Sequence, residues 1–361
     1  MSATTTAERE SLSPVREAVA HLPPGYFAAV MGTGIVSIGL HAAGIRSLSA
    51  VLLWAAAALY VVLWALYIWR AVAFWHRVVA DLRDPEIAFA YFTVVAATDV
   101  LGVRLAQEGL NLVAIPLFLF AALVWFVFGY VLPWQVLMTR DGRPILARAN
   151  GTWFIWAVAS QSLAIGMAQL RPQVDSVFAP WVGLLTVLAW SVGVILYAAM
   201  AMLVLLRVVH HGVTPQQFDP AYWVAMGALA IAVVAGAAIV QMERTPMVDA
   251  VRPLIAATVV VFWVFCLWLI PLLVGAGFWR HALHHVPLRY VPSLWSMVFP
   301  MGMFAVASLS LGEADALPAA GTVGGVALIV AVIVWAVVSI GMLHRLLTVV
   351  AASLRRRSAR A

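Results

Sequence analysis

The stretch PPGYFAAVMGTGIVSIG, residues 23–39, is the first hydrophobic run of the chain and contains Gly25, Gly32, Gly34 and Gly39. Each glycine inside a helix weakens that helix by about 1 kcal/mol relative to alanine. Small residues at this density therefore need a purpose. In a membrane helix they allow neighbouring helices to pack closely, or they leave room beside a central axis.

The composition places most of the chain in lipid. Of the 361 residues, 65% are hydrophobic and 10% are charged, and the mean hydropathy is +1.01. One soluble core cannot hide that much apolar surface. A helix needs about 20 apolar residues to cross a bilayer, and the sequence contains ten such runs. They cover residues 25–44, 48–69, 87–103, 110–132, 152–170, 181–206, 221–240, 254–274, 294–311 and 322–343. The chain is predicted to be an all-α polytopic membrane protein with ten transmembrane helices.

Arginine placement predicts the orientation of these helices. We expect a short cytoplasmic N-terminal tail at 1–22, the ten-helix domain at 23–345 and a basic cytoplasmic C-terminal tail at 346–361. Of the 21 basic residues, all arginine, 16 fall on the side of the termini and five on the other. The positive-inside rule then puts both termini in the cytoplasm of a bacterial inner membrane. The net charge of +6 reports this orientation, and no nucleic-acid partner is expected.

A repeat divides the ten runs into two kinds. The first, third, fifth, seventh and ninth each start at a Pro or Asn-Gly, continue through an aromatic cluster and then carry small or polar residues. These segments are residues 23–39, 85–102, 150–166, 219–236 and 291–308. The runs between them consist mainly of Leu, Val, Ala and Trp, which suits lipid contact. The repeat predicts five parallel helical hairpins in a ring around a central pore, with the odd helices inside.

The odd helices would all begin at the cytoplasmic mouth of this ring. Each N-terminus contributes about half a positive charge, and its free N–H groups bind anions. Asp84, Asn150 and Asp219 are predicted N-caps. The prolines that suit the first helical turn are Pro24, Pro85, Pro220 and Pro292. The bore contains no arginine, which favours weak binding and passage of anions.

Small and polar residues at corresponding positions of the repeats are the candidate lining of the substrate path. Gly32, Thr33 and Gly34 come from the first odd helix, and Thr98 and Ser160 from the next two. A role in close helix packing remains open for each glycine.

The ninth run contains Pro300 in its middle, in the sequence WSMVFPMG. Proline removes one backbone hydrogen bond and kinks a helix, so the neighbouring Phe299 could be aimed off the regular face. Pro300 is counted with the substrate path. For Phe299 the residues leave open packing, lipid contact and a gating role.

Asp99 is the carboxylate that lies well inside an apolar run. An intramembrane acid is costly to ionise and is a functional-site hypothesis by default. Asp99 could couple transport to protons. It could instead be structural, either paired with Arg104 or hydrogen-bonded to a neighbouring Ser or Thr.

Other chemistry is poorly represented. The spacing of His281 and His285 suits two metal ligands on a helix, but no third ligand is near. We expect no metal, no cofactor and no enzymatic activity, because neither a phosphate loop nor a catalytic triad is recognisable. A membrane-embedded enzyme or receptor, which would give turnover or a ligand response without flux, is the remaining alternative.

The segments FAAVMGTGIVSIG and LWSMVFPMGMFAVAS resemble the tellurite-resistance and dicarboxylate transporter family. It includes TehA-like proteins, malate permeases, sulfite efflux pumps and plant slow-type anion channels. The malate and sulfite branch is most similar, through the Met-Gly-Thr-Gly motif at residues 31–34. The resemblance implies a trimer with one pore in each subunit. It also implies a pore-closing phenylalanine on the ninth helix, which Phe299 matches.

Together these observations predict a membrane protein that passes small anions through a central pore gated by an aromatic side chain. Candidate anions are C4-dicarboxylates such as malate, sulfite, and halide or nitrate. The alternative is a proton-coupled C4-dicarboxylate carrier that uses Asp99.

Overall fold

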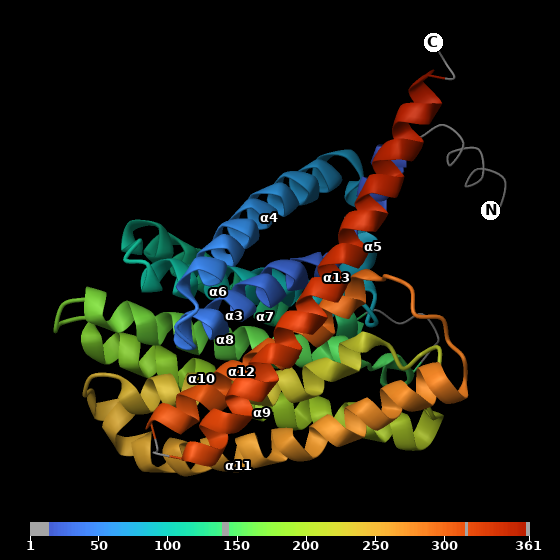
Figure 1. Cartoon of the computed structure of the whole chain (residues 1–361). Helices are drawn as coiled ribbons and strands as arrows, with labels where there is room; N and C mark the ends of the chain where they lie inside the picture. Colours follow the sequence, from blue (N-terminus) through green and yellow to red (C-terminus); the bar gives the residue numbers. More distant parts are fainter. Residues whose placement is uncertain (1–13, 139–143, 315–316, 359–361) are drawn as a thin grey trace.

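The computed structural model describes residues 14–138, 144–314 and 317–358, and these ranges contain helices and no strand (Figure 1). Ten of the helical segments are long and apolar enough to cross a membrane, and each overlaps one of the ten predicted runs. The prediction of an all-α polytopic membrane protein is therefore confirmed. The ends of the two predicted tails, residues 1–13 and 359–361, lie outside the described residues.

The helices form five consecutive hairpins. The inner helices are α3 (Ala28–Ala42), α6 (Thr93–Gln107), α8 (Phe154–Leu170), α10 (Val224–Gln241) and α12 (Trp295–Ala314). The outer helices are α4 (Arg46–Ala73), α7 (Asn111–Met138), α9 (Ala179–His211), α11 (Pro246–Phe278) and α13 (Pro318–Ser358). Each inner helix packs against the outer helix that follows it in the chain.

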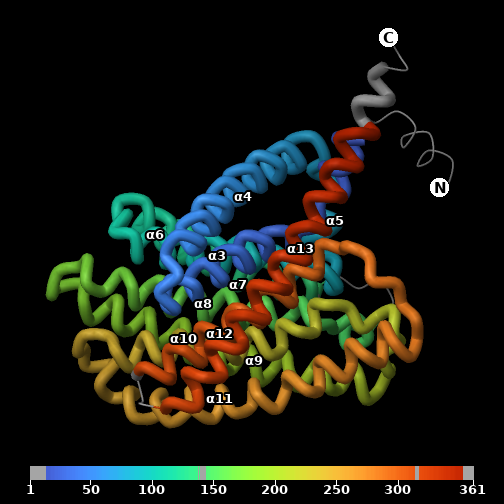
Figure 2. Tube along the Cα trace, viewed as in Figure 1, coloured from blue at the N-terminus to red at the C-terminus, as the bar shows by residue number. Residues whose placement is uncertain are grey.

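The five inner helices close into a ring. Contacts run from α3 to α6, α8, α10 and α12 in turn, and α12 packs back against α3 (Figures 1 and 2). In the odd spans 78–100% of the apolar stretch is buried inside the protein, against 17–28% in the even spans. The outer helices thus present exposed Leu, Val, Ile and Trp side chains to the surroundings, as the contrast between odd and even runs predicts.

Each inner helix is preceded by a short 3₁₀ turn, and these turns form a second ring. They are η1 (Pro24–Phe27), η2 (Ala88–Phe92), η4 (Gly151–Trp153), η6 (Pro220–Trp223) and η8 (Pro292–Leu294). Every turn contacts its two neighbours, including η8 with η1. At Gly151 an added Cβ would overlap the backbone of Ala221, so η4 and η6 come this close because residue 151 has no side chain. The N-termini of all five inner helices therefore meet at one end of the bundle.

Several helices extend beyond the predicted apolar runs. α11 begins at Pro246 and continues through Pro253, which the sequence pattern treats as a break. α13 continues as one helix to Ser358, so the described part of the predicted C-terminal tail is helical. The N-terminal tail contains α2 (Pro14–Ala20), which packs against α13. α5 (Trp75–Arg83) joins the first hairpin to the second. The remaining short turns are η3 (Ile145–Arg148), η5 (Arg171–Gln173) and the π-helical η7 (Trp279–Leu283).

Candidate functional site

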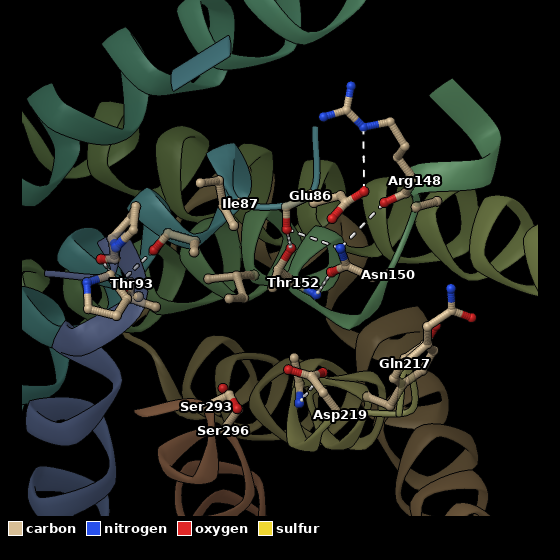
Figure 3. A pocket seen from close by; sticks show the side chains of 18 of the residues that line it. Glu86, Ile87, Thr93, Arg148, Asn150, Thr152, Gln217, Asp219, Ser293 and Ser296 are labelled. Atoms are coloured by element: carbon tan, nitrogen blue, oxygen red, sulfur yellow. Dashed lines mark hydrogen bonds and ion pairs between the residues drawn. The ribbon is translucent and has the colours of Figure 1, made fainter. Parts of the chain in front are cut away.

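A cavity of about 410 Å³ opens at the end of the bundle where the inner helices begin (Figure 3). All five 3₁₀ turns or the residues next to them contribute to its wall. Its polar lining includes Glu86, Thr93, Arg148, Asn150, Thr152, Arg207, Gln217, Asp219, Ser293 and Ser296. The cavity therefore lies on the axis of the ring, at the N-terminal ends of the inner helices.

Two of the three predicted N-caps are present at this cavity. The third, Asp84, is wrong, because the residue before η2 is Ile87, which makes no side-chain cap hydrogen bond. Asn150 Oδ1 accepts a hydrogen bond from the backbone N–H of Thr152 at 2.8 Å, and Asp219 Oδ1 accepts one from Ala221 at 3.0 Å. The turns η1 and η8 begin with proline and have no side-chain cap. Their positive ends thus face the cavity without an acidic cap to offset them.

Charged side chains of both signs surround the cavity. Arg148 bonds Asp84 at 2.5 Å and lies 3.6 Å from Glu86, so acidic partners accompany this cation. Burial raises the pKa of Asp219, although the Ala221 N–H, Arg280 and Ser293 act in the opposite direction. The sequence indicates no arginine in the bore, whereas the structure adds Arg148 and Arg207 to its mouth.

Phe299 of α12 is 2% exposed and is not among the residues that line this cavity. Successive residues of a helix are about 100° apart around its axis. The two residues that flank Phe299 in sequence lie against the neighbouring inner helices. Val298 packs where a Cβ on Gly32 of α3 would lie, and Pro300 packs against Gly227 of α10. Phe299 is therefore on the face of α12 between these two contacts.

This face of α12 is directed either toward the axis of the ring or toward the outer helices. The contact of α12 with the outer helix α11 distinguishes these two directions. Ser308, nine residues later and thus about half a turn away, accepts a hydrogen bond from Trp263 of the outer helix α11 at 2.9 Å. Phe299 consequently faces the axis of the ring. It follows Ser296, a cavity-lining residue, by three positions, or about 4.5 Å along the helix.

The Gly-Thr-Gly motif of α3 makes helix–helix contacts. A Cβ on Gly32 would lie 3.0 Å from Val298 of α12, and one on Gly34 would lie 2.7 Å from Val100 of α6. Thr33, between them, accepts a hydrogen bond from Trp335 of α13 at 3.1 Å. These contacts correspond to the close-packing role that the sequence left open for the glycines, and they direct Thr33 toward the outer layer.

Thr98 and Ser160 occupy the same kind of position on the next two inner helices. Thr98 Oγ1 is 2.9 Å from the hydroxyl of Tyr60 on α4, and Ser160 Oγ accepts from Trp125 Nε1 on α7 at 2.9 Å. Both side chains also donate to their own helix backbone. The correspondence between repeats that the sequence indicates is therefore present, and its partners are aromatic residues of the outer helices.

Asp99 is buried between α6 and α8. Its Oδ2 accepts a hydrogen bond from Ser162 at 2.9 Å, and among the described residues Oδ1 has no hydrogen-bond partner. Arg104 is engaged elsewhere, with Glu108 at 2.7 Å and with the hydroxyls of Ser37 and Ser49. Of the two structural partners that the sequence leaves open for Asp99, the structure has the serine.

Arg207 is one of several cavity residues that sequence reasoning missed. It comes from α9, an outer helix assigned to lipid contact, and an arginine near the end of such a helix reads as a positive-inside signal. A recurrence could have drawn attention to it. Arg70, Arg207, Arg280 and Arg345 occupy similar places in the C-terminal parts of four outer helices or directly after them.

A closed ring of parallel hairpins, with the helix N-termini around a polar cavity, is the architecture of a membrane transport protein. Comparison with known proteins identifies the group. The chain belongs to the SLAC1 family, described as voltage-dependent anion channel, whose family model matches residues 21–343. The resemblance to the tellurite-resistance and dicarboxylate transporter family is thereby confirmed. This membership supports a multi-pass membrane protein that acts in anion transport.

Individual relatives agree with this assignment. An uncharacterized membrane protein of Mycobacterium tuberculosis is 47% identical over 151 residues, which are 42% of this chain and 77% of the relative. An uncharacterized transporter of Methanocaldococcus jannaschii is 25% identical over 285 residues, covering 77% of this chain and 81% of the relative. A second transporter of that organism is also 25% identical, over 291 residues, which cover 79% and 82%. The names of the two Methanocaldococcus relatives describe transporters.

Proposed function

We propose that the chain conducts small anions along the axis of the inner ring, from the cavity past Phe299. The observation that carries the proposal is the position of Phe299, which faces the axis about one helical turn below a cavity bounded by five helix N-termini. Helix N-termini attract anions, and a buried phenyl ring on the axis is a steric barrier. The anion would enter the cavity, lose part of its hydration and pass when the ring moves aside.

Flux through purified protein in liposomes tests this function. Phe299→Ala removes the barrier and is expected to raise basal anion flux several-fold above that of the wild-type protein. Unchanged or lower flux in correctly folded Phe299→Ala protein would contradict the gate. Absence of flux in both proteins would contradict the anion-conducting function itself.

Phe304→Ala is the matched control. Phe304 is on the same helix and is also 2% exposed. It precedes Ser308 by four residues, so it shares the face of α12 that contacts the outer helix α11. Its truncation leaves a similar void in the core but not on the axis. Basal flux is expected to stay at the wild-type level in this variant.

The proposed substrates are small anions: C4-dicarboxylates such as malate, sulfite, and halide or nitrate. Support comes from the family and from the size of the cavity at the inner mouth, about 410 Å³. Fluxes of malate, sulfite, nitrate and chloride, each measured under the same electrochemical gradient, would rank them. A passive channel gives flux proportional to that gradient.

Asp99 favours a second candidate function, a proton-coupled carrier. Its Oδ1 has no hydrogen-bond partner among the described residues, and no arginine neutralises it, since Arg104 pairs with Glu108. A buried acid without a counter-ion is a suitable proton carrier in a transporter. The carrier predicts that a pH gradient alone drives accumulation of malate in liposomes, and that Asp99→Asn abolishes this accumulation. Identical accumulation in Asp99→Asn and wild-type protein would contradict it.

We also propose a homotrimer in the inner membrane with both termini in the cytoplasm. The exposed apolar side chains of the outer helices leave surface for lipid and for other subunits. α2 packs against α13, so the described terminal segments lie on the same side of the bundle as the inner-helix N-termini. Mass measurement in nanodiscs tests the trimer, and reporter fusions at each terminus test the orientation.

A further inference from the structure

Arg207 stands out among the charged residues of the cavity because it reaches the inner mouth from an outer helix. It is 7% exposed and lines the cavity. Its Nη1 donates to the hydroxyl of Tyr222 at 3.2 Å, which ties the guanidinium to the turn η6. Among the described residues, its buried Nε has no hydrogen-bond partner.

Two arginines in comparable places have acidic partners, whereas Arg207 has none among the described residues. Arg148 pairs with Asp84 and Glu86. Arg70, in the corresponding part of α4, is 2.7 Å from Asp81. Within the part of the chain that the structure describes, no carboxylate lies within 4.0 Å of the Arg207 guanidinium. A buried charge without a counter-ion is costly, so an ion from solution would be bound favourably here.

The geometry of the free donors indicates the kind of ion. With Nη1 bonded to Tyr222, the side-on edge of the guanidinium, made by Nε and Nη2, is left over. Two parallel N–H groups on this edge match two oxygens of a carboxylate or another oxyanion, whereas a spherical halide gains only the charge. This pair of parallel N–H groups, the guanidinium fork, therefore favours oxyanions over halides.

We propose that Arg207, held by Tyr222, is the entry site at which the inner mouth selects small oxyanions over halides. The proposal rests on the anion-conducting function above and adds a substrate class and a recognition residue to it. The bound oxyanion shares the cavity with the uncapped starts of η1 and η8, from which it moves toward Phe299.

Binding and flux measurements test the entry site separately. In detergent, nitrate and malate are expected to raise the thermal midpoint of the wild-type protein more than chloride does at equal ionic strength. This difference is expected to disappear in Arg207→Gln. In liposomes, Arg207→Gln is expected to raise the half-saturating concentration of nitrate at the inner face by about tenfold, equivalent to 1.4 kcal/mol. Its effect on chloride is expected to be much smaller.

Two further variants keep the result interpretable. Arg83→Gln removes an exposed arginine that does not line the cavity, and it is expected to behave as wild type. Arg207→Lys keeps the positive charge but lacks the two parallel N–H groups of the guanidinium. It is expected to keep chloride flux and to lose the preference for oxyanions. This variant also tests the entry site if Arg207→Gln does not fold. An unchanged nitrate dependence in the Arg207 variants, or an equal loss for nitrate and chloride, would overturn the entry site. Wild-type protein without any anion flux would instead refute the proposed function, and the thermal measurement would still test the site.

Discussion

The indole Nε1 of Trp335 on α13 donates a hydrogen bond to Thr33 Oγ1 on α3 at 3.1 Å, which joins the last outer helix to the first inner one. The same kind of bond recurs around the ring, each time from an outer helix to the inner helix of the next hairpin. The other pairs are Tyr60 with Thr98, Trp125 with Ser160, Trp190 with the carbonyl of Ala232, and Trp263 with Ser308. We call these five bonds the inter-hairpin bonds. They link each hairpin to its successor and so close the ring.

Breaking one of the inter-hairpin bonds is expected to lower the stability of the fold. Trp335→Phe keeps a large aromatic ring but removes the N–H, which leaves Thr33 without its partner. The expected loss is about 1 kcal/mol of stability, seen as a lower thermal midpoint in detergent. Trp268→Phe is the control, because Trp268 is 62% exposed on an outer helix. Equal thermal midpoints for the two variants would contradict a stabilising role for the inter-hairpin bonds.

The ring of 3₁₀ turns is expected to be intolerant of a side chain at residue 151. Gly151→Ala puts a methyl group into the backbone of Ala221, which cannot move aside as a flexible side chain can. Overpacking of this kind typically costs about 1–3 kcal/mol, and we expect a reduced yield of monodisperse protein and a lower thermal midpoint. Gly275→Ala, whose added Cβ meets no atom within 4 Å, should not lower the thermal midpoint. A stable Gly151→Ala protein would show that the two turns separate easily.

The contact between Gly227 and Pro300 is expected to control the position of Phe299. A Cβ on Gly227 would lie 2.7 Å from Pro300 Cγ and 3.1 Å from its Cα, so α12 must shift beside Phe299. Gly227→Ala is therefore expected to change basal anion flux in liposomes while the protein stays folded. Gly277→Ala, with no neighbouring atom within 4 Å, is the control. Wild-type flux in Gly227→Ala would mean that the gate does not depend on this contact.

Asp219 predicts how anion flux depends on pH at the inner mouth. Burial raises the pKa of this carboxyl, so it takes up a proton at a higher pH than an ordinary aspartic acid does. Protonation removes a negative charge from the cavity, and the charged group that faces Asp219 is Arg280. Anion flux is therefore expected to rise as the inner pH falls through the pKa of Asp219.

Asp219→Asn separates this effect from other titrations. Its side-chain oxygen can still accept the Ala221 N–H, so the cap remains, but the charge is gone. We expect higher flux at neutral pH and a weaker rise on acidification than in the wild-type protein. Glu86→Gln removes another, more exposed, carboxylate from the same cavity and serves as the comparison. The same pH profile in Asp219→Asn and wild-type protein would exclude Asp219 as its source.

The contrast between odd and even runs was sufficient to predict the ring of inner helices. Lipid-facing helices need apolar side chains along most of their surface, and helices that pack on all sides need small ones. The composition of each helix therefore predicts whether it belongs to the inner or the outer layer. The direction of a single side chain is a different matter. Thr33 and its counterparts are polar and recur in register, which suits either a pore lining or a hydrogen bond to the outer layer.

By itself, the sequence determined the ten membrane spans, the five hairpins and the separation into inner and outer helices, because these follow from local hydropathy and residue size. Only the tertiary structure decided that Phe299 faces the axis, that Thr33 bonds an outer tryptophan and that Arg207 reaches the mouth. Each of these depends on the rotation of one helix against its neighbours. That rotation is set by contacts such as Val298 on Gly32, between residues more than 260 positions apart.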